Sequence, residues 1–508
     1  MRFRVCLLFL TTATPLAAQS AVDTTGVGRL LDQAMNRSEV MQNLQYLSDV
    51  IGPRLSGSPA MRRANEWTAS RFKAYGVPAR LEAYEFGITW ERGAATMRLL
   101  APFTRAITAH SWAWTEGTGG KPVDGPVVMT DVSTPESLAV YLDRVKGAWV
   151  LTRAPLPVWN PDGPEMTAKD SLEFEEKKNL RASLTADTSA EAITARRQFQ
   201  IDLPYRLKAA GALGTLIDGS KEHALMTMSG SPTRIAPLPS LVISHEDYTL
   251  LARLIAAGRT PRVEAQVQNR LGRSPVQQWN TLAEIRGSER PGQVVILGAH
   301  LDSWDLGTGV TDNGTGSMVV LETARIIAKS GLKPKRSIRF VLFSGEEQGL
   351  LGSRAYAAAH EDEADSIQAV LVLDNGTGAV TGQALQGRDE LRQLWEQLLA
   401  PVASLDADSI RSATKSGTDH LSFLPYGVPG FNFDQLTRGY NHTHHSQSDT
   451  YDKAVAGDLK QASAVMAITA WELANLRDLI PRGPKSPVVP VPDKPSPGLA
   501  ARSQPVSR

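Results

Sequence analysis

From residue 280 onward, short apolar strands alternate with helices along the chain. The strands have the sequences VVILGAH, SIRFVLFSG and AVLVLDNG, and the helices that follow them cover residues 317–329, 350–359 and 388–399, with a last helix at 456–479. Apolar strands separated by helices are typical of a parallel sheet that is buried on both faces. The sequence therefore predicts an α/β fold with a largely parallel, doubly covered sheet.

Each of these three strands ends next to a residue that can bind a metal ion. His300 ends the first strand, Glu346 and Glu347 end the second, and Asp374 ends the third. Open parallel sheets bind ligands just beyond the carboxyl ends of their strands, so side chains far apart in sequence can converge on one cleft there. The Glu346–Glu347 pair is the most informative, because folding does not require two mutually repelling carboxylates at the end of an apolar strand.

Three further segments add residues of the same chemical type. Asp302 stands two residues after His300 and can orient its imidazole, Asp312 lies in the glycine-rich loop TDNGTG, and HTHHSQSDT holds several histidines. Imidazole and carboxylate groups bind zinc-type ions, and a two-metal site also needs a bridging carboxylate and a base for water. Every role has a candidate, which indicates a hydrolase. The residues alone leave open which histidine binds metal, and an N-cap or turn role for Asp312.

Composition excludes several classes of partner. The chain has 54 basic and 53 acidic residues and no basic stripe, so we expect no nucleic-acid partner. Beyond the N-terminus, no apolar run approaches the roughly 20 residues that span a bilayer, so we expect no membrane partner. The partner has to be inferred from the site.

Residues 1–20 have the pattern of a secretory signal, with two arginines, the apolar run Val5–Leu10 and then small residues. We therefore expect export to a periplasm or to the medium. The single cysteine, Cys6, lies in this segment, so the mature chain would have no thiolate ligand or nucleophile. Glycosylation sequons lie inside the candidate metal segments, where a glycan would block the site; this favours a bacterial source. The sequons begin at Asn313, Asn375 and Asn441.

Changes in composition divide the chain into five parts. The charged stretch Lys169–Arg197 interrupts the third part, and we expect it to form a helix that faces solvent. Eight prolines predict that the last part is disordered. The expected parts are a signal peptide at 1–20, the N-terminal part of the main domain at 21–120, an inserted β-rich domain at 121–272, the metal-binding part of the main domain at 273–480, and a Pro-rich tail at 481–508.

The segments GAHLDSWDLG, LKPKRSIRFVLFSGEEQG, GTDHLSF and HHSQSDT resemble the co-catalytic zinc aminopeptidase and glutamate carboxypeptidase family, in particular its carboxypeptidase Q branch. The resemblance covers roughly residues 30 to 480. It implies a zinc-aminopeptidase-like α/β fold, an inserted protease-associated domain at 121–272, two Zn²⁺ ions per chain, a short peptide substrate and a homodimer.

The resemblance also implies roles for individual residues. It places His300 and Asp374 on one ion, Glu347 and His445 on the other, and Asp312 between them. It makes Glu346 the acid/base, has Asp302 orient His300, and offers His444 as a stabiliser of the oxyanion. Asp419, in GTDH, lies in a segment near the family's substrate pocket.

The implied activity is the hydrolysis of dipeptides or short peptides by a metal-activated water. One alternative is an aminopeptidase that trims longer peptides. Two others are a non-catalytic binding protein on the same fold and a single-zinc cyclotransferase. The chain also departs from the carboxypeptidase Q pattern at Asn313, where a second acid usually follows the bridging aspartate, and this puts the substrate range in doubt.

Overall fold

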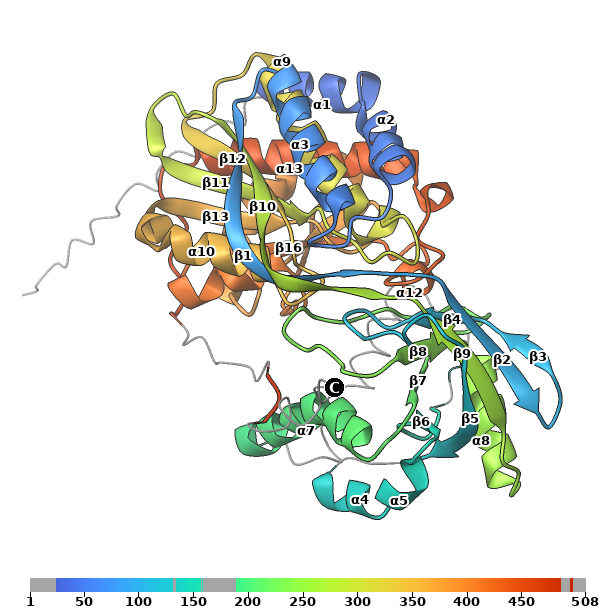
Figure 1. Ribbon diagram of the computed structural model, residues 1–508. Coiled ribbons are helices and arrows are strands. Elements are labelled where there is room, and N and C mark those ends of the chain that lie inside the picture. Colours follow the sequence, from blue (N-terminus) through green and yellow to red (C-terminus); the bar gives the residue numbers. More distant parts are fainter. Residues whose placement is uncertain (1–23, 131–133, 157, 159–188, 486–493, 497–508) are drawn as a thin grey trace, which may run out of the picture.

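The computed structural model describes residues 24–130, 134–156, 158, 189–485 and 494–496. The predicted signal segment therefore lies outside the described residues, as does most of the Lys169–Arg197 stretch. The described chain forms two eight-stranded sheets (Figure 1). No helix among these residues is long and apolar enough to cross a membrane.

The first sheet has a parallel centre and antiparallel margins. Its strand order is β1-β10-β12-β11-β13-β16-β14-β15, and the four strands from β12 to β16 run parallel. The predicted α/β fold is confirmed, with β1, β10 and β14 as antiparallel additions. The strands are β1 (Ala79–Glu91), β10 (Arg270–Ile285), β11 (Arg290–His300), β12 (Arg336–Phe343), β13 (Ile367–Val372), β14 (Val380–Ala384), β15 (Ser409–Arg411) and β16 (Gly430–Gln435).

Helices cover both faces of this sheet. Successive residues of β11 point to opposite sides: Val295 and Leu297 join the core under most of the helices, and Val294 and Ile296 join the core beneath α10. The first face carries α1 (Thr24–Asn36), α2 (Val40–Gln45), α3 (Pro59–Ala74), α9 (Thr315–Ser330), α11 (Arg392–Leu399) and α13 (Ala456–Asn475), and the second carries α10 (Leu351–Ala359).

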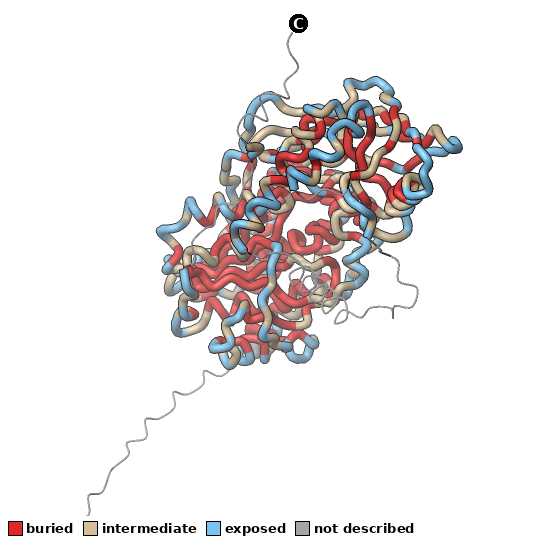
Figure 2. Tube along the Cα trace, turned by 90° about the horizontal axis from the view of Figure 1, so that it is seen from below, coloured by how far each residue is buried: buried red, intermediate tan, exposed pale blue. Residues whose placement is uncertain are grey.

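Short helical turns connect these elements. They are η1 (Tyr46–Ile51), η2 (Val310–Gly314), η3 (Glu361–Ser366), η4 (Asp389–Leu391), η5 (Ala400–Leu405), η6 (Asp419–Ser422), η7 (Leu424–Tyr426), α12 (Tyr440–Thr443) and η8 (Tyr451–Lys453). The central strands β12 and β13 are buried at every position, and Figure 2 shows the buried strands surrounded by more exposed helices and loops.

The second sheet lies beside the first and has helices of its own. Its strand order is β3-β2-β9-β5-β6-β7-β8-β4, with β5 to β8 parallel. The strands are β2 (Ala95–Ala101), β3 (Arg105–Ile107), β4 (Ala109–Ser111), β5 (Val123–Met129), β6 (Trp149–Leu151), β7 (Gly214–Asp218), β8 (Ser240–Ile243) and β9 (Arg262–Val267), and the helices are α4 (Pro135–Ala139), α5 (Leu142–Val145), α7 (Ala190–Ala209) and α8 (His245–Ala256).

The second sheet begins earlier in the chain than the expected boundary at residue 121. Strands β2, β3 and β4 belong to it, although the sequence analysis assigned residues 21–120 to the main domain. The reason is a distant pairing: Met97 of β2 lies opposite Ala265 of β9, and no local pattern shows which strand a partner will be.

An apolar cluster joins the two sheets. The long antiparallel pair β1 and β10 runs from the first sheet toward the second (Figure 1). At its end, side chains from both units pack together, including Trp114, Met226 and Met228 from the second and Trp304 from the first. We call these four residues the junction cluster. Its burial fixes the second sheet against the loop that follows β11.

Part of the predicted disordered tail is ordered where the structure describes it. The Gly483 amide donates to the Gly427 carbonyl (3.0 Å), and the Ser496 hydroxyl donates to an Asp202 carboxylate oxygen on α7 (2.7 Å). Backbone and hydroxyl groups can make such bonds without large apolar side chains, which is why a low apolar content alone did not reveal them. Residues 486–493 and 497–508 lie outside the described part.

Candidate metal centre

Three neighbouring strand ends carry the metal-type residues, as the sequence predicts. In the parallel register, His300 at the end of β11 lies opposite Phe343 at the end of β12, and Gly298 lies opposite Val372 at the end of β13. Because these ends are level, the segments that follow β12 and β13 bring Glu346, Glu347 and Asp374 to the same edge as His300.

Asp312 lies at the centre of this group, with one carboxylate oxygen toward each side. Its Oδ1 is 3.3 Å from His300 Nε2, which is in turn 3.3 Å from Asp374 Oδ1. Its Oδ2 is 3.4 Å from His445 Nε2, which is 2.9 Å from Glu347 Oε2. The five side chains therefore form two half-sites, each with one histidine and one carboxylate, that share Asp312.

The unpaired atoms of these side chains fit two divalent ions. Within the described residues, Asp312 Oδ2, Glu347 Oε1 and Asp374 Oδ1 are buried and have no hydrogen-bond partner. Buried carboxylate oxygens without partners are costly unless a cation or proton satisfies them. The donor set of imidazole nitrogen and carboxylate oxygen is that of zinc sites, and a shared carboxylate is what two ions at close range need.

His300 is held in place by the residues that follow it. Its Nδ1 is 3.0 Å from the Asp302 backbone carbonyl and 3.6 Å from the Asp302 carboxylate. The same carboxylate accepts hydrogen bonds from the Glu346 and Glu347 amides at 3.3 and 3.4 Å. Asp302 therefore contacts both the histidine and the turn with the two glutamates, which leaves His300 Nε2 directed at Asp312.

Several side chains of this centre have strongly shifted pKa values. Burial alone lowers the pKa of His300, but the nearby carboxylates, Asp374 and Glu346 foremost, outweigh it and raise that pKa well above its ordinary value. Burial raises the pKa of Glu346 well above normal, and the Asp374 and Asp419 carboxylates add to the effect. Bound cations would offset these shifts, because they stabilise the carboxylates and compete for the imidazole.

The histidines of HTHHSQSDT have different positions. His445, in the left-handed region with φ of 58°, belongs to the second half-site. His444 stacks on it with ring centroids 3.8 Å apart, and its Nε2 is 3.8 Å from Asp312 Oδ2. Burial and the neighbouring His445 lower the pKa of His444 to about 4, so its imidazole is neutral at pH 7. His442 is exposed.

Two supporting residues were missed by sequence reasoning. Asp449 accepts hydrogen bonds from the Thr311 and Asp312 amides at 2.6 and 3.1 Å and so fixes the loop with the shared carboxylate. Arg54 is completely buried, and its guanidinium donates to the carbonyls of Leu301, Thr308 and Gly309 around the same loop. Asp449 stands next to the histidines in HTHHSQSDT, whereas Arg54 lies in the Gly/Pro/Ser-rich segment IGPRLSGSP, which holds no metal-type residue.

Asp419 is also drawn into the centre. It is completely buried at the start of η6, and burial raises its pKa to about 7. Its charge in turn raises the pKa of Glu346, which places its carboxylate in the electrostatic environment of that residue. Asn313, the departure from the family pattern, bonds to the Leu373 carbonyl and the Gly316 amide, a backbone-supporting role that an acid could not fill in the same way.

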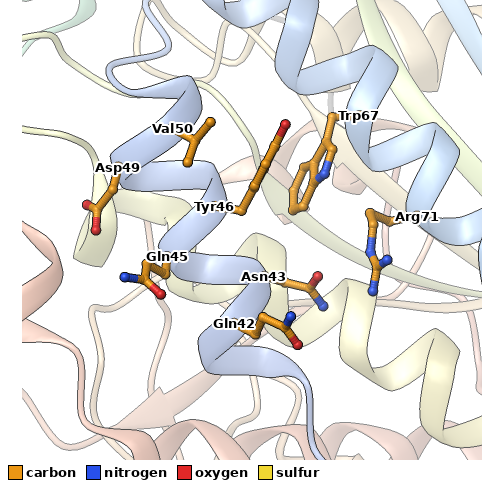
Figure 3. Close-up of a pocket in the computed structure, with 8 residues that line it drawn as sticks. All are labelled: Gln42, Asn43, Gln45, Tyr46, Asp49, Val50, Trp67 and Arg71. Atoms are coloured by element: carbon orange, nitrogen blue, oxygen red, sulfur yellow. The ribbon is translucent and has the colours of Figure 1, made fainter.

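A separate surface cavity of about 560 Å³ lies on the N-terminal helices (Figure 3). Tyr46 and Trp67 stack across it with centroids 5.0 Å apart, and none of the five side chains of the two half-sites lines it. We therefore base the functional assignment on the strand-end cluster.

Comparison with known proteins supports this choice. Residues 280–470, which contain every residue of the two half-sites, match Peptidase family M28. The chain is 27% identical to carboxypeptidase Q of Bos taurus over 92% of its length and 90% of that protein, and 28% identical to carboxypeptidase Q of Homo sapiens over 89% and 88%. These relatives agree with the family that the sequence segments indicated.

Solved structures agree on the fold. A Peptidase M28 precursor from Shewanella amazonensis superposes with a TM-score of 0.72 at 24% identity, covering 91% of this chain and 99% of that one. A zinc aminopeptidase from Bacillus subtilis gives 0.59 at 19% identity, covering 85% and 94%. The two-sheet α/β architecture is thus shared across both proteins.

Proposed function

From the membership of residues 280–470 in Peptidase family M28, we propose that this chain is an exported metallopeptidase that uses two zinc ions to hydrolyse dipeptides or short peptides. The observation that carries the proposal is the position of Asp312, whose two carboxylate oxygens face two equivalent half-sites. Export rests on the signal-like pattern of residues 1–20.

In this proposal His300 and Asp374 would hold one ion, His445 and Glu347 would hold the other, and Asp312 would be shared between them. Bound ions at such a site lower the pKa of a water molecule and polarise a carbonyl group. Glu346 lies next to Glu347 in the turn that follows β12. Its carboxylate accepts the proton of the attacking water and passes it to the leaving amine. The neutral imidazole of His444 donates a hydrogen bond to the developing oxyanion.

A contact from the second sheet supports the preference for short substrates. The Met226 and Met228 amides of one of its loops donate to Gln447 and His445, and we infer that this loop limits the space on that side of the centre. The relatives named carboxypeptidase Q and the structure named zinc aminopeptidase differ in the peptide end that their names imply. Cleavage of a dipeptide, which has both free ends within reach of the centre, is compatible with both names.

The test is the Glu346→Gln variant, measured with wild-type protein at equal zinc content on free dipeptides and amino-acid anilides. Without the carboxylate base, kcat should fall by about 10²–10⁴-fold on both substrates while two ions per chain remain bound. Glu396→Gln, an exposed glutamate on α11, is the matched control and should behave as wild type.

Three outcomes would contradict the proposal. Unchanged turnover in Glu346→Gln would remove Glu346 as the base. Wild-type activity confined to anilides and longer peptides would favour the aminopeptidase alternative. One ion per fully active chain would contradict the shared role of Asp312.

A further inference from the structure

One loop of the second sheet reaches the metal centre. It connects β7 to β8, and its residues 224–228 bond to the segment that contains His445. The Met228 amide donates to the His445 carbonyl at 2.9 Å, and the Met226 amide donates to the Gln447 side chain at 3.0 Å. The Gln447 side chain returns a bond to the Ala224 carbonyl at 2.9 Å. We call residues 219–230 the wall loop.

The wall loop places a lysine beside the two half-sites. Lys221 is half-buried, and its ammonium donates to the carbonyl of Asn441, three residues before His444. The same loop is bonded to His445 through the Met228 amide, so the ammonium lies against the short segment, residues 441–445, that carries both His444 and His445.

Lys221 has charge and hydrogen-bonding capacity left for a ligand. Among the described residues, no carboxylate forms a salt bridge with it, and an ammonium has three donors, of which the Asn441 carbonyl takes one. Burial lowers its pKa to about 8, so it stays mostly protonated at pH 7.

The lysine is also fixed before any ligand arrives. Asp218, at the end of β7, pairs with His245 at 3.0 Å and accepts a hydrogen bond from the Ser220 amide at 2.9 Å. The Arg153 guanidinium donates to the Ser220 hydroxyl at 3.0 Å. A charged group held in this way loses little conformational freedom when it binds, which makes it effective in recognition.

We propose that Lys221 binds the C-terminal carboxylate of the substrate and thereby makes free dipeptides the preferred substrate class. In a dipeptide this carboxylate is only about 4 Å from the scissile carbonyl carbon, because three backbone bonds separate them. A cation next to the metal centre is where such a carboxylate would lie, and a longer peptide would carry its carboxylate past it. The inference rests on the proposed peptidase function and adds the residue that reads the substrate's end.

The experiment compares a dipeptide with its C-terminal amide, which has the same scissile bond but no carboxylate. In wild type, kcat/KM should favour the free dipeptide. In Lys221→Met the ratio of dipeptide to amide should fall by about ten- to a hundredfold, mainly through KM, since a charge-assisted bond to the ground state is lost. Lys221→Arg should restore most of the ratio, and Lys121→Met, an exposed lysine of the second sheet, should not change it.

Each other outcome overturns one part. If the ratio in Lys221→Met equals that of wild type while dipeptides are still cleaved, the carboxylate-binding role is wrong and the peptidase function stands. If the variant loses both substrates equally, Lys221 supports the fold of the His444 segment and does not read the carboxylate; a lowered melting temperature would accompany that result. If wild type cleaves neither substrate, the proposed function itself fails.

Discussion

Both sheets carry a histidine and an aspartate beyond the ends of parallel strands, yet only one sheet builds a candidate metal centre. At the first sheet, His300 and Asp374 face Asp312, and buried carboxylate oxygens are left without partners. At the second sheet, Asp218 and His245 bond to each other at 3.0 Å. Among the described residues, two groups of histidine and carboxylate side chains lie close enough together to share an ion. Asp312 belongs to both groups, and Asp218 belongs to neither.

The comparison teaches that residue type and strand-end position do not by themselves define a metal site. In the second sheet Asp218 bonds to His245 and to the Ser220 amide, so the pair stabilises the wall loop and needs no ion. In the first sheet Asp449 and Arg54 hold the backbone of the loop that carries Asp312, and Asp312, Glu347 and Asp374 each keep a buried oxygen without a hydrogen-bond partner. Buried polar atoms without hydrogen-bond partners cost stability, and at the first sheet they mark the candidate functional site.

The largest expected effect comes from removing one aspartate from each sheet. Asp312→Ala deletes the only carboxylate shared by both half-sites, so the variant should lose both ions and all measurable peptidase activity. Asp218→Ala should keep its zinc, because it breaks only a pair that stabilises the wall loop, and should show a raised KM for dipeptides. Zinc content by atomic absorption and dipeptide kinetics measure both. Zinc loss in Asp218→Ala would contradict this difference, because it would show that zinc binding also depends on the second sheet.

A second pair of variants tests what the junction cluster does. Trp304 is buried between Trp114 and His445, with ring centroids 6.3 and 5.9 Å away, whereas Trp149 is buried inside the second sheet alone. Either change to alanine should cost about 3–5 kcal/mol of stability because both empty a packed core.

Only Trp304→Ala should also weaken zinc binding and kcat/KM, by about 10–100-fold, since it removes the support of a metal-ligand side chain. Chemical denaturation gives the stability, and zinc titration of the folded protein gives the affinity. Equal zinc affinities in the two variants would show that the junction cluster holds the sheets together without orienting His445.

The sequence revealed these candidate site residues because their signal is local. His300, Glu346, Glu347 and Asp374 each follow an apolar strand directly, and a parallel sheet aligns such ends whatever the intervening chain does. The choice of His445 over His444 needed the family resemblance, and the structure places His445 beside Glu347.

The remainder depends on contacts between distant segments. Arg54 supports a loop about 250 residues away, and Lys221 reaches the centre only because the wall loop lies against residues 441–447. The strand β2 joins the second sheet through β9, more than 160 residues later. No periodicity or spacing within one segment encodes these pairings, so pattern reading placed the boundary of the second sheet too late in the chain.

The smallest expected effect is on the number of protons released when zinc binds. This number should depend on His300 in the first sheet and not on the Asp218–His245 pair in the second. The pKa of metal-free His300 lies well above its ordinary value, so at pH 7 its imidazole is protonated and zinc must displace that proton. Zinc affinity should therefore fall as the pH drops, by about tenfold per pH unit for each proton released. It should level off once the pH exceeds the raised pKa of His300. Titration calorimetry in buffers of different ionisation enthalpy measures this release. His245→Gln in the second sheet should leave the count unchanged, because His245 pairs with Asp218 and not with an ion. A zinc-binding enthalpy that does not depend on the buffer at pH 7 would show that no net proton is released, which would contradict a protonated His300 in the protein before zinc binds.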